Sequence, residues 1–174
     1  MDRNAECDTL YRTTVAEYGA ALDRLAVAYE ADPEKRRDLR QEIHLQLWRS
    51  LERFDGRCSL KTWSFRVAHN VAVTWVVREK RNKANLVSLE DIAALPRDPA
   101  RPPDIDGPRA MERLLAMIRN LKPLDRQIML SYLEEMDAAS ISAITGLSPA
   151  NVAMKIHRIK NVLARNFHEE NQHA

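Results

Sequence analysis

The chain has 174 residues, enough for one domain or two small ones. Apolar residues make up 45% and charged residues 30%, as in many globular proteins, and a formal charge of +2 by itself indicates no class of partner. The four glycines lie far apart, which excludes a glycine-rich phosphate loop and a dinucleotide-binding fingerprint. Few glycines and long uninterrupted segments also argue against a β-sandwich, so we predict an all-α protein.

No segment has the hydrophobicity of an export signal or a membrane helix. Residues 1–14 contain no apolar stretch typical of a signal peptide, and no apolar run approaches the roughly 18 residues of a membrane helix. Cys7 and Cys58 form no CxxC motif, the five histidines lack zinc-binding spacing, and no nucleophile and base form a catalytic pair. We therefore expect a cytoplasmic protein that is not an enzyme and that holds no metal and no cofactor.

Three helices are predicted in the first part of the chain. Residues 10–29 carry an apolar stripe with helical spacing. Asp32-Pro33-Glu34 then supplies an N-cap, a proline in the first turn and an acidic residue, so a second helix should run from there to about Phe54. Ser59 should cap a third helix that runs to about Lys80.

The third predicted helix combines a buried stripe with a strong positive charge. Trp63, Val67, Val71 and Trp75 follow helical spacing and indicate a core face. Between residues 61 and 83 there are six basic residues and one acidic residue, a net charge of +5. Basic side chains between aromatic ones suit contact with nucleic-acid phosphates and bases. A solvated helix face with the tryptophans in the core explains the same residues, and both interpretations stay open.

Five of the eight prolines lie between residues 96 and 108, so this stretch cannot form a regular helix. We predict a proline-rich linker over residues 83–108, which joins a small helical domain at residues 1–82 to a second at residues 109–174. An extended chain with scattered carboxylates that lies in a basic channel is compatible with this composition, and a flexible tether, the default interpretation, explains it equally well.

The second domain contains the spacing of a helix-turn-helix motif. Asp137 should cap a short helix over residues 138–145, and Ser148-Pro149 should start the last one. Ser142 is small enough for the two helices to cross closely, Gly146 suits a turn with positive φ, and Val152 should lock the second helix against the first. The last helix has a basic outer face and an apolar inner one, which fits a DNA major groove, although an ordinary helical hairpin is the alternative.

Two segments resemble bacterial sigma factors of the extracytoplasmic-function (ECF) group, within the sigma-70 family. The segment that resembles region 2 of that family is LRQEIHLQLWRSLERFDGRCSLKTWSFRVAHNVAVTWVVREKR. The segment that resembles region 4 is LKPLDRQIMLSYLEEMDAASISAITGLSPANVAMKIHRIKNVLA. The resemblance implies a sigma factor that binds core RNA polymerase and directs promoter-specific transcription initiation. It also implies promoter DNA and an anti-sigma factor, often membrane-anchored, as partners, with no small-molecule substrate.

The resemblance assigns roles to individual residues of the first domain. In this family, region 2 binds the clamp helices of the largest catalytic polymerase subunit, and the matching polar positions lie on the second helix, whereas Leu39 and Trp48 are expected in the core. We assign polymerase binding to Asp38, Gln41, Glu42 and Leu45. The third helix matches the element that melts and recognises the −10 promoter element, with Asn70 as a candidate for binding a base. We assign −10 DNA binding to Lys61, Trp63, Arg66, Asn70, Trp75, Arg78, Lys80 and Arg81.

The last helix matches the element that recognises the −35 sequence. We assign −35 DNA binding to Ser148, Asn151, Ala153, Met154, Lys155, His157 and Arg158. The last three should contact bases and the first two phosphates, while Ala153 and Met154, where many relatives carry polar residues, can touch only a thymine methyl. Ser140 stands where glutamate is usual, which we interpret as a local difference in helix capping. A stand-alone helix-turn-helix regulator and a protein-interaction module are the alternative functions.

Overall fold

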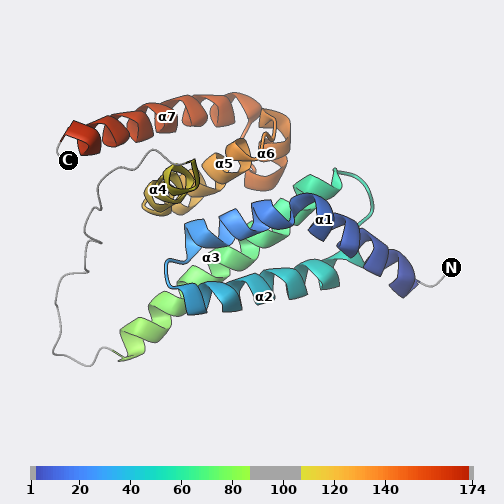
Figure 1. Cartoon of the computed structure of the whole chain (residues 1–174). Helices are drawn as coiled ribbons and strands as arrows, with labels where there is room; N and C mark the ends of the chain where they lie inside the picture. The colour runs from blue at the N-terminus through green and yellow to red at the C-terminus, as the bar shows by residue number, and fades with distance from the viewer. Residues whose placement is uncertain (1–2, 87–106, 173–174) are drawn as a thin grey trace.

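The computed structural model describes residues 3–86 and 107–172, and this part of the chain forms seven helices and no strand. The helices are α1 (Arg3–Tyr29), α2 (Pro33–Leu51), α3 (Leu60–Leu86), α4 (Gly107–Arg119), α5 (Pro123–Leu133), α6 (Ala138–Thr145) and α7 (Pro149–Gln172) (Figure 1). The all-α prediction is therefore confirmed. None of the described helices combines the length and the apolar character that crossing a membrane requires.

Helices α1, α2 and α3 pack on one another as the first helical unit. Leu22 and Leu25 of α1, Ile43 of α2 and Phe65 of α3 are almost completely buried between them. The Asp32 carboxylate accepts hydrogen bonds from the backbone N–H groups of the first turn of α2, at 2.9 and 3.2 Å, so the predicted N-cap is confirmed. This unit buries one shared apolar core, as three amphipathic helices must.

The ends of these helices differ from the predicted ones. α1 begins at Arg3, ahead of its apolar stripe, and this added segment packs on α2: Cys7 is buried and its thiol donates to the Trp48 carbonyl at 3.4 Å. α2 ends at Leu51, before Phe54, and Gly56 takes a positive φ of 73° in the turn that follows. α3 continues to Leu86, beyond the predicted end.

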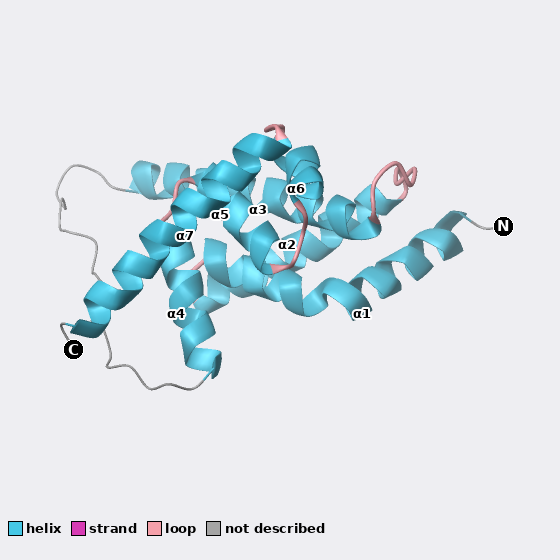
Figure 2. Cartoon of the chain, turned by 90° about the horizontal axis from the view of Figure 1, so that it is seen from above, coloured by secondary structure: helices cyan, strands magenta, loops and turns pink. Residues whose placement is uncertain are grey.

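Helices α4 to α7 form the second unit, and they pack against the first. α4 contacts α1, while α5 and α6 contact α3 (Figures 1 and 2). A single cluster of buried side chains therefore runs from Ala21 in α1 to Leu163 in α7. Sequence alone made no prediction of this contact. Residues 87–106, which hold most of the predicted linker, lie outside the described residues, so the domain limits at 82 and 109 stay a prediction.

Candidate nucleic-acid interface

The turn between α6 and α7 has the geometry that the sequence predicts for a helix-turn-helix. Gly146 takes a φ of 76°, and its N–H donates to the Ser142 carbonyl at 2.9 Å. The Ser142 hydroxyl donates to the Leu147 carbonyl at 2.5 Å, a bond across the turn that adds to the small size of this side chain. Val152 is completely buried, so the expected packing of α7 on α6 is confirmed.

Asp137 closes the start of α6. Its carboxylate accepts a hydrogen bond from the Ser140 N–H at 2.7 Å, and this bond lowers the pKa of Asp137. At the start of α7, the Ser148 hydroxyl accepts from the Asn151 N–H at 3.3 Å. Both caps satisfy backbone donors that a helix start otherwise leaves unpaired.

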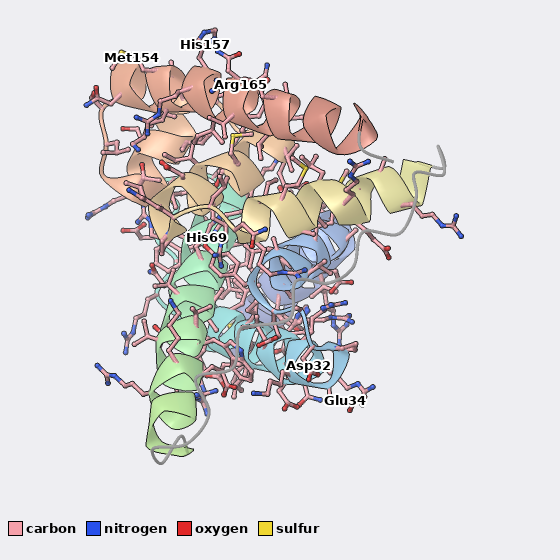
Figure 3. The ribbon with its side chains drawn as sticks, turned by 90° about the vertical axis from the view of Figure 1, so that its left-hand side faces the viewer. Asp32, Glu34, His69, Met154, His157 and Arg165 are labelled. Carbon is pink, nitrogen blue, oxygen red and sulfur yellow. The ribbon has the colours of Figure 1, made fainter. Side chains whose placement is uncertain are left out.

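The outer face of α7 is open to solvent. Figure 3 shows Met154 and His157 at the outer edge of the molecule, directed away from the other helices. The Met154 residue is 68% exposed, and the Arg158 side chain is 70% exposed. Six of the seven residues assigned to −35 DNA are exposed together along this helix: Ser148, Asn151, Ala153, Met154, His157 and Arg158.

Lys155 is the seventh, and it is held by an ion pair. Its ammonium lies 2.7 Å from Oδ1 of Asp125, at the start of α5, and Arg158 reaches Oδ2 of the same carboxylate at 4.0 Å. The side chains of Lys155 and Asp125 are only 28% and 14% exposed. Sequence reasoning missed Asp125, because it lies 30 residues before its partner and belongs to a different helix.

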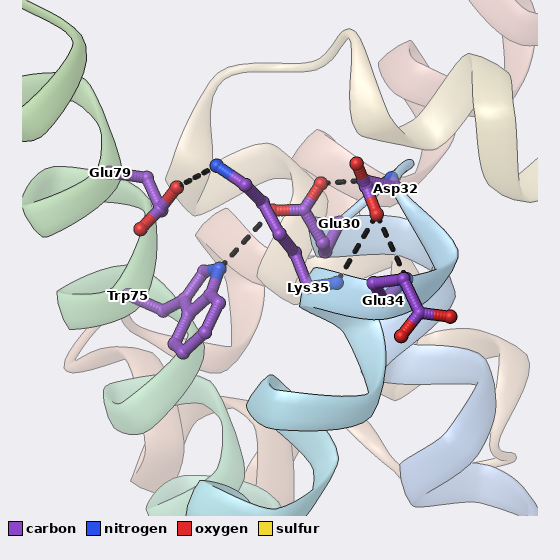
Figure 4. A network of polar contacts seen from close by, with 6 residues as sticks. All are labelled: Glu30, Asp32, Glu34, Lys35, Trp75 and Glu79. Atoms are coloured by element: carbon purple, nitrogen blue, oxygen red, sulfur yellow. Dashed lines mark hydrogen bonds and ion pairs between the residues drawn. The ribbon is translucent and has the colours of Figure 1, made fainter. Parts of the chain in front are cut away.

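On α3, both tryptophans of the predicted −10 surface turn toward the protein. The half-buried Trp63 indole donates to the Ser50 hydroxyl at 3.0 Å and meets the Phe54 ring edge to face, with ring centroids 5.5 Å apart. Trp75 is 7% exposed, and its indole donates to the Glu30 carboxylate at 3.2 Å (Figure 4). These contacts fit the core interpretation, and the assignment of both residues to DNA stays a prediction.

Glu30 belongs to a polar network that joins α1, α2 and α3 (Figure 4). Its carboxylate also accepts from the Asp32 N–H at 3.0 Å, and the Lys35 ammonium of α2 pairs with Glu79 of α3. The network fixes the orientation of the Trp75 ring, over which the Arg78 guanidinium lies 4.7 Å from the centroid.

The basic residues of α3 fall into two groups. Lys61 donates to the backbone carbonyl of Glu134, and Arg66 donates to that of Ala143 at 2.8 Å, so both contact the second helical unit. The other basic residues assigned to −10 DNA are Arg78, Lys80 and Arg81, which are exposed, as is the uncharged Asn70. Of the exposed group, Asn70 and Arg78 line a groove between α2 and α3, and Glu42 lines its other side.

The residues assigned to polymerase binding lie on α2. Asp38, Gln41 and Leu45 are exposed, whereas Glu42 is half-buried and accepts a hydrogen bond from the Gln46 side chain at 2.9 Å. Leu39 is fully buried as predicted. The expectation that Trp48 is a core residue is wrong: it is 37% exposed and its indole donates to the Asp8 carboxylate at 3.0 Å. Among the described residues, no three His, Cys, Asp or Glu side chains could together hold a metal ion.

Two parts of the chain match regions of one protein family. Residues 14–82 match sigma-70 region 2, and residues 111–163 match sigma-70 region 4. The ECF RNA polymerase sigma factor SigG of Mycobacterium tuberculosis is 28% identical over 148 residues, covering 72% of this chain and 40% of SigG. SigX of Bacillus subtilis, also an ECF RNA polymerase sigma factor, is 30% identical over 60 residues, covering 34% of this chain and 31% of SigX. The chain therefore spans about two fifths of SigG.

Two solved structures share the fold of the chain. CnrH, solved in complex with the cytosolic domain of CnrY, has a TM-score of 0.66 at 19% identity and covers 96% of both chains. The sigma factor RpoE of Bartonella quintana, solved with the anti-sigma factor NepR, has a TM-score of 0.66 at 18% identity, over 89% of this chain and 94% of RpoE. The matches to regions 2 and 4 together span more than half of the sequence, so the chain belongs to the sigma-70 family.

Proposed function

We propose that the chain is a sigma factor that binds core RNA polymerase and directs promoter-specific initiation in the cytoplasm, without catalysis of its own. The observation that carries this proposal is the pairing of sigma-70 regions 2 and 4 in one chain, the second of them with an exposed, basic helix-turn-helix face. A stand-alone DNA-binding regulator needs only the second of these units, so region 2 would have no role in it.

The α7 face would recognise the −35 element. A helix whose inner side is buried and whose outer side carries His157 and Arg158 can enter the major groove, where arginine forms paired hydrogen bonds with guanine. Met154 offers an apolar surface to a thymine methyl group. Ser148 and Asn151, at the start of the helix, are placed to contact phosphates.

The first unit would bind the −10 element and the polymerase on neighbouring surfaces. Asn70 and Arg78 are exposed on α3 and could contact DNA without any rearrangement. On α2, the exposed residues are Asp38, Gln41 and Leu45. For Lys61 and Arg66 to reach DNA, their hydrogen bonds to the carbonyls of Glu134 and Ala143 must be released. Promoter binding by these two residues therefore requires the two helical units to separate, at least locally.

Transcription in vitro tests the function directly. Core RNA polymerase is incubated with a pooled genomic promoter library, with and without the protein, and start sites are mapped. Discrete starts that depend on the protein, with shared −10 and −35 sequences upstream, are the expected result. If no start depends on the protein and it does not co-elute with core polymerase, the proposal is wrong and a free DNA-binding regulator becomes the better interpretation.

Co-elution with core polymerase also tests the α2 surface. Leu45→Ala removes an exposed apolar side chain there and should weaken co-elution. Val15→Ala removes a comparably exposed apolar side chain from α1 and is the matched control. Equal co-elution of both variants would contradict the assignment of Leu45.

We also propose an anti-sigma factor as a regulatory partner. The fold relative RpoE was solved with such a protein, which supports looking for one here. Affinity capture of the tagged chain from cells under several stress conditions should recover a second protein besides polymerase. Recovery of polymerase alone under every condition would contradict this partner.

A further inference from the structure

We propose that Asp125 is a positioning residue for DNA recognition: by holding the Lys155 ammonium, it limits contact with DNA of any sequence and so raises the preference for one −35 sequence. This inference rests on the proposed function, because it concerns how the α7 face discriminates between DNA sequences.

Asp125 contacts two of the three side chains assigned to bases, Lys155 and Arg158. Asp125 Oδ1 lies 2.7 Å from the Lys155 ammonium, and Oδ2 lies 4.0 Å from the Arg158 guanidinium. Asp125 is 14% exposed and Lys155 28%, so water screens the pair only in part. The Arg158 side chain, at 70% exposure, stays open toward solvent. Asp125 therefore restrains the lysine much more strongly than the arginine.

The two cations differ in what they contribute to specificity. Although the sequence assigns Lys155 to a base, its ammonium is a point charge that binds any phosphate within reach, whereas an arginine presents a planar fork that matches a guanine edge. Each phosphate contact strengthens binding to all DNA sequences alike and steepens its dependence on salt. Pairing Lys155 with a carboxylate removes one phosphate contact from the complex with DNA that lacks the −35 element. Arg158 remains free to distinguish bases.

A purely structural role is the alternative, because the same ion pair joins α5 to α7. The two roles predict opposite changes. If Asp125 only fastens the helices, its removal loosens the α7 face and weakens binding to every DNA. If it restrains Lys155, its removal strengthens binding to DNA that lacks the −35 element.

The experiment uses Asp125→Asn in the complex with core polymerase. Affinity is measured for a promoter duplex from the transcription screen and for the same duplex with a scrambled −35 element, across a KCl series. We expect several-fold tighter binding to the scrambled duplex, a smaller ratio between the two affinities, and a logarithmic salt slope steeper by about one unit. Glu135→Gln, an exposed position just after α5 with the same change in charge, controls for long-range electrostatics. In a Lys155→Ala background, Asp125→Asn should have little effect on either affinity.

The remaining outcomes overturn the inference in distinguishable ways. Unchanged affinities and slope in Asp125→Asn, or a parallel loss of both affinities with a lower melting temperature, would leave Asp125 with a structural role alone. An equal effect in the Lys155→Ala background would mean that the carboxylate acts through its own repulsion of phosphates. If the wild-type complex itself does not distinguish the two duplexes, the proposed −35 recognition fails, and the inference fails with it.

Discussion

The Glu134 carboxylate accepts two hydrogen bonds from the guanidinium of Arg24, each 2.7 Å long, across 110 residues of sequence. Arg24 belongs to the part of the chain that matches region 2, and Glu134 to the part that matches region 4. The backbone carbonyl of Glu134 also accepts from Lys61, so one residue of the second unit binds two cations of the first. Glu134 is therefore a principal polar contact between the two units.

Glu134→Gln should weaken this contact, because an amide cannot replace both charge-assisted hydrogen bonds. The Arg24 side chain is 36% exposed and that of Glu134 13%, which places the pair between a surface and a buried ion pair. We expect unfolding to become easier by about 1–2 kcal/mol. Urea denaturation measures this change, and small-angle scattering should detect a larger radius of gyration if the units also separate. The exposed Glu135→Gln is the control, and equal stability of the two variants would contradict the role of Glu134.

Stability should also depend on pH through His69, which lies where α1, α3 and α5 meet. Its ring is fully buried, with Nδ1 3.2 Å from the Tyr29 hydroxyl and Nε2 3.4 Å from the Ser131 hydroxyl. Burial lowers the pKa of His69 to about 3, from 6.5 in an exposed state. The neutral ring is therefore favoured in the folded chain, so its stabilising effect is complete above pH 6.5 and is lost as the pH falls below that value.

Between pH 7.5 and 5.5 this residue should cost the wild-type protein about 1.4 kcal/mol of unfolding free energy, since each pH unit below 6.5 is worth about that much. His69→Gln, which keeps hydrogen-bonding groups but does not titrate, is the control. Its own stability at pH 7.5 will be lower, but the loss between the two pH values should shrink. His44, whose pKa is also lowered by burial, contributes equally in both proteins. The same loss in both would show that His69 does not carry the effect.

The parts of the fold and of the site that depend on local sequence were predictable. The cap at Asp32, the left-handed turn at Gly146 and the buried Val152 follow from residues within a few positions of one another. The pairs Arg24–Glu134 and Lys155–Asp125 join residues 110 and 30 positions apart, and their formation depends on how whole helices pack.

The tryptophans of α3 illustrate a second limit. Helical spacing and amphipathic chemistry left Trp63 and Trp75 with two interpretations, core packing and stacking on bases. Only the positions of Ser50 and Glu30 reveal that both indoles donate hydrogen bonds within the protein. The sequence around an aromatic residue does not show whether its ring faces the core or the solvent, because its hydrogen-bond partners, here Ser50 and Glu30, lie outside α3.

Gly146→Ala should destabilise the second unit through backbone conformation alone. The φ of 76° is unfavourable for a residue with a Cβ, yet a Cβ at this position would meet no other atom within 4 Å. We expect a loss of about 1–2 kcal/mol, measured by thermal or urea unfolding. Gly107→Ala, at the open start of α4 and without a positive φ, should be neutral or slightly stabilising. Equal effects at both glycines would contradict the strain at Gly146.

Arg158→Ala should reduce binding to the −35 element without affecting folding. The side chain is 70% exposed and its nearest acidic group, Asp125, lies 4.0 Å away, so little stabilising energy within the protein depends on it. If the guanidinium forms paired hydrogen bonds with a base, its loss should cost about 1–3 kcal/mol on the promoter duplex and less on a duplex with a scrambled −35 element. Both affinities are measured with the protein bound to core polymerase.

Arg165→Ala is the matched control for Arg158→Ala, because it removes the same charge from an exposed position two turns later on α7. Losing a phosphate contact at either position would weaken binding to both duplexes to a similar extent and make the salt slope shallower by about one unit. Losing a contact with a base would instead reduce the ratio between the two affinities. If a correctly folded Arg158→Ala protein keeps that ratio, Arg158 contributes charge but no base recognition, and the discrimination must come from His157, Met154 or the −10 surface.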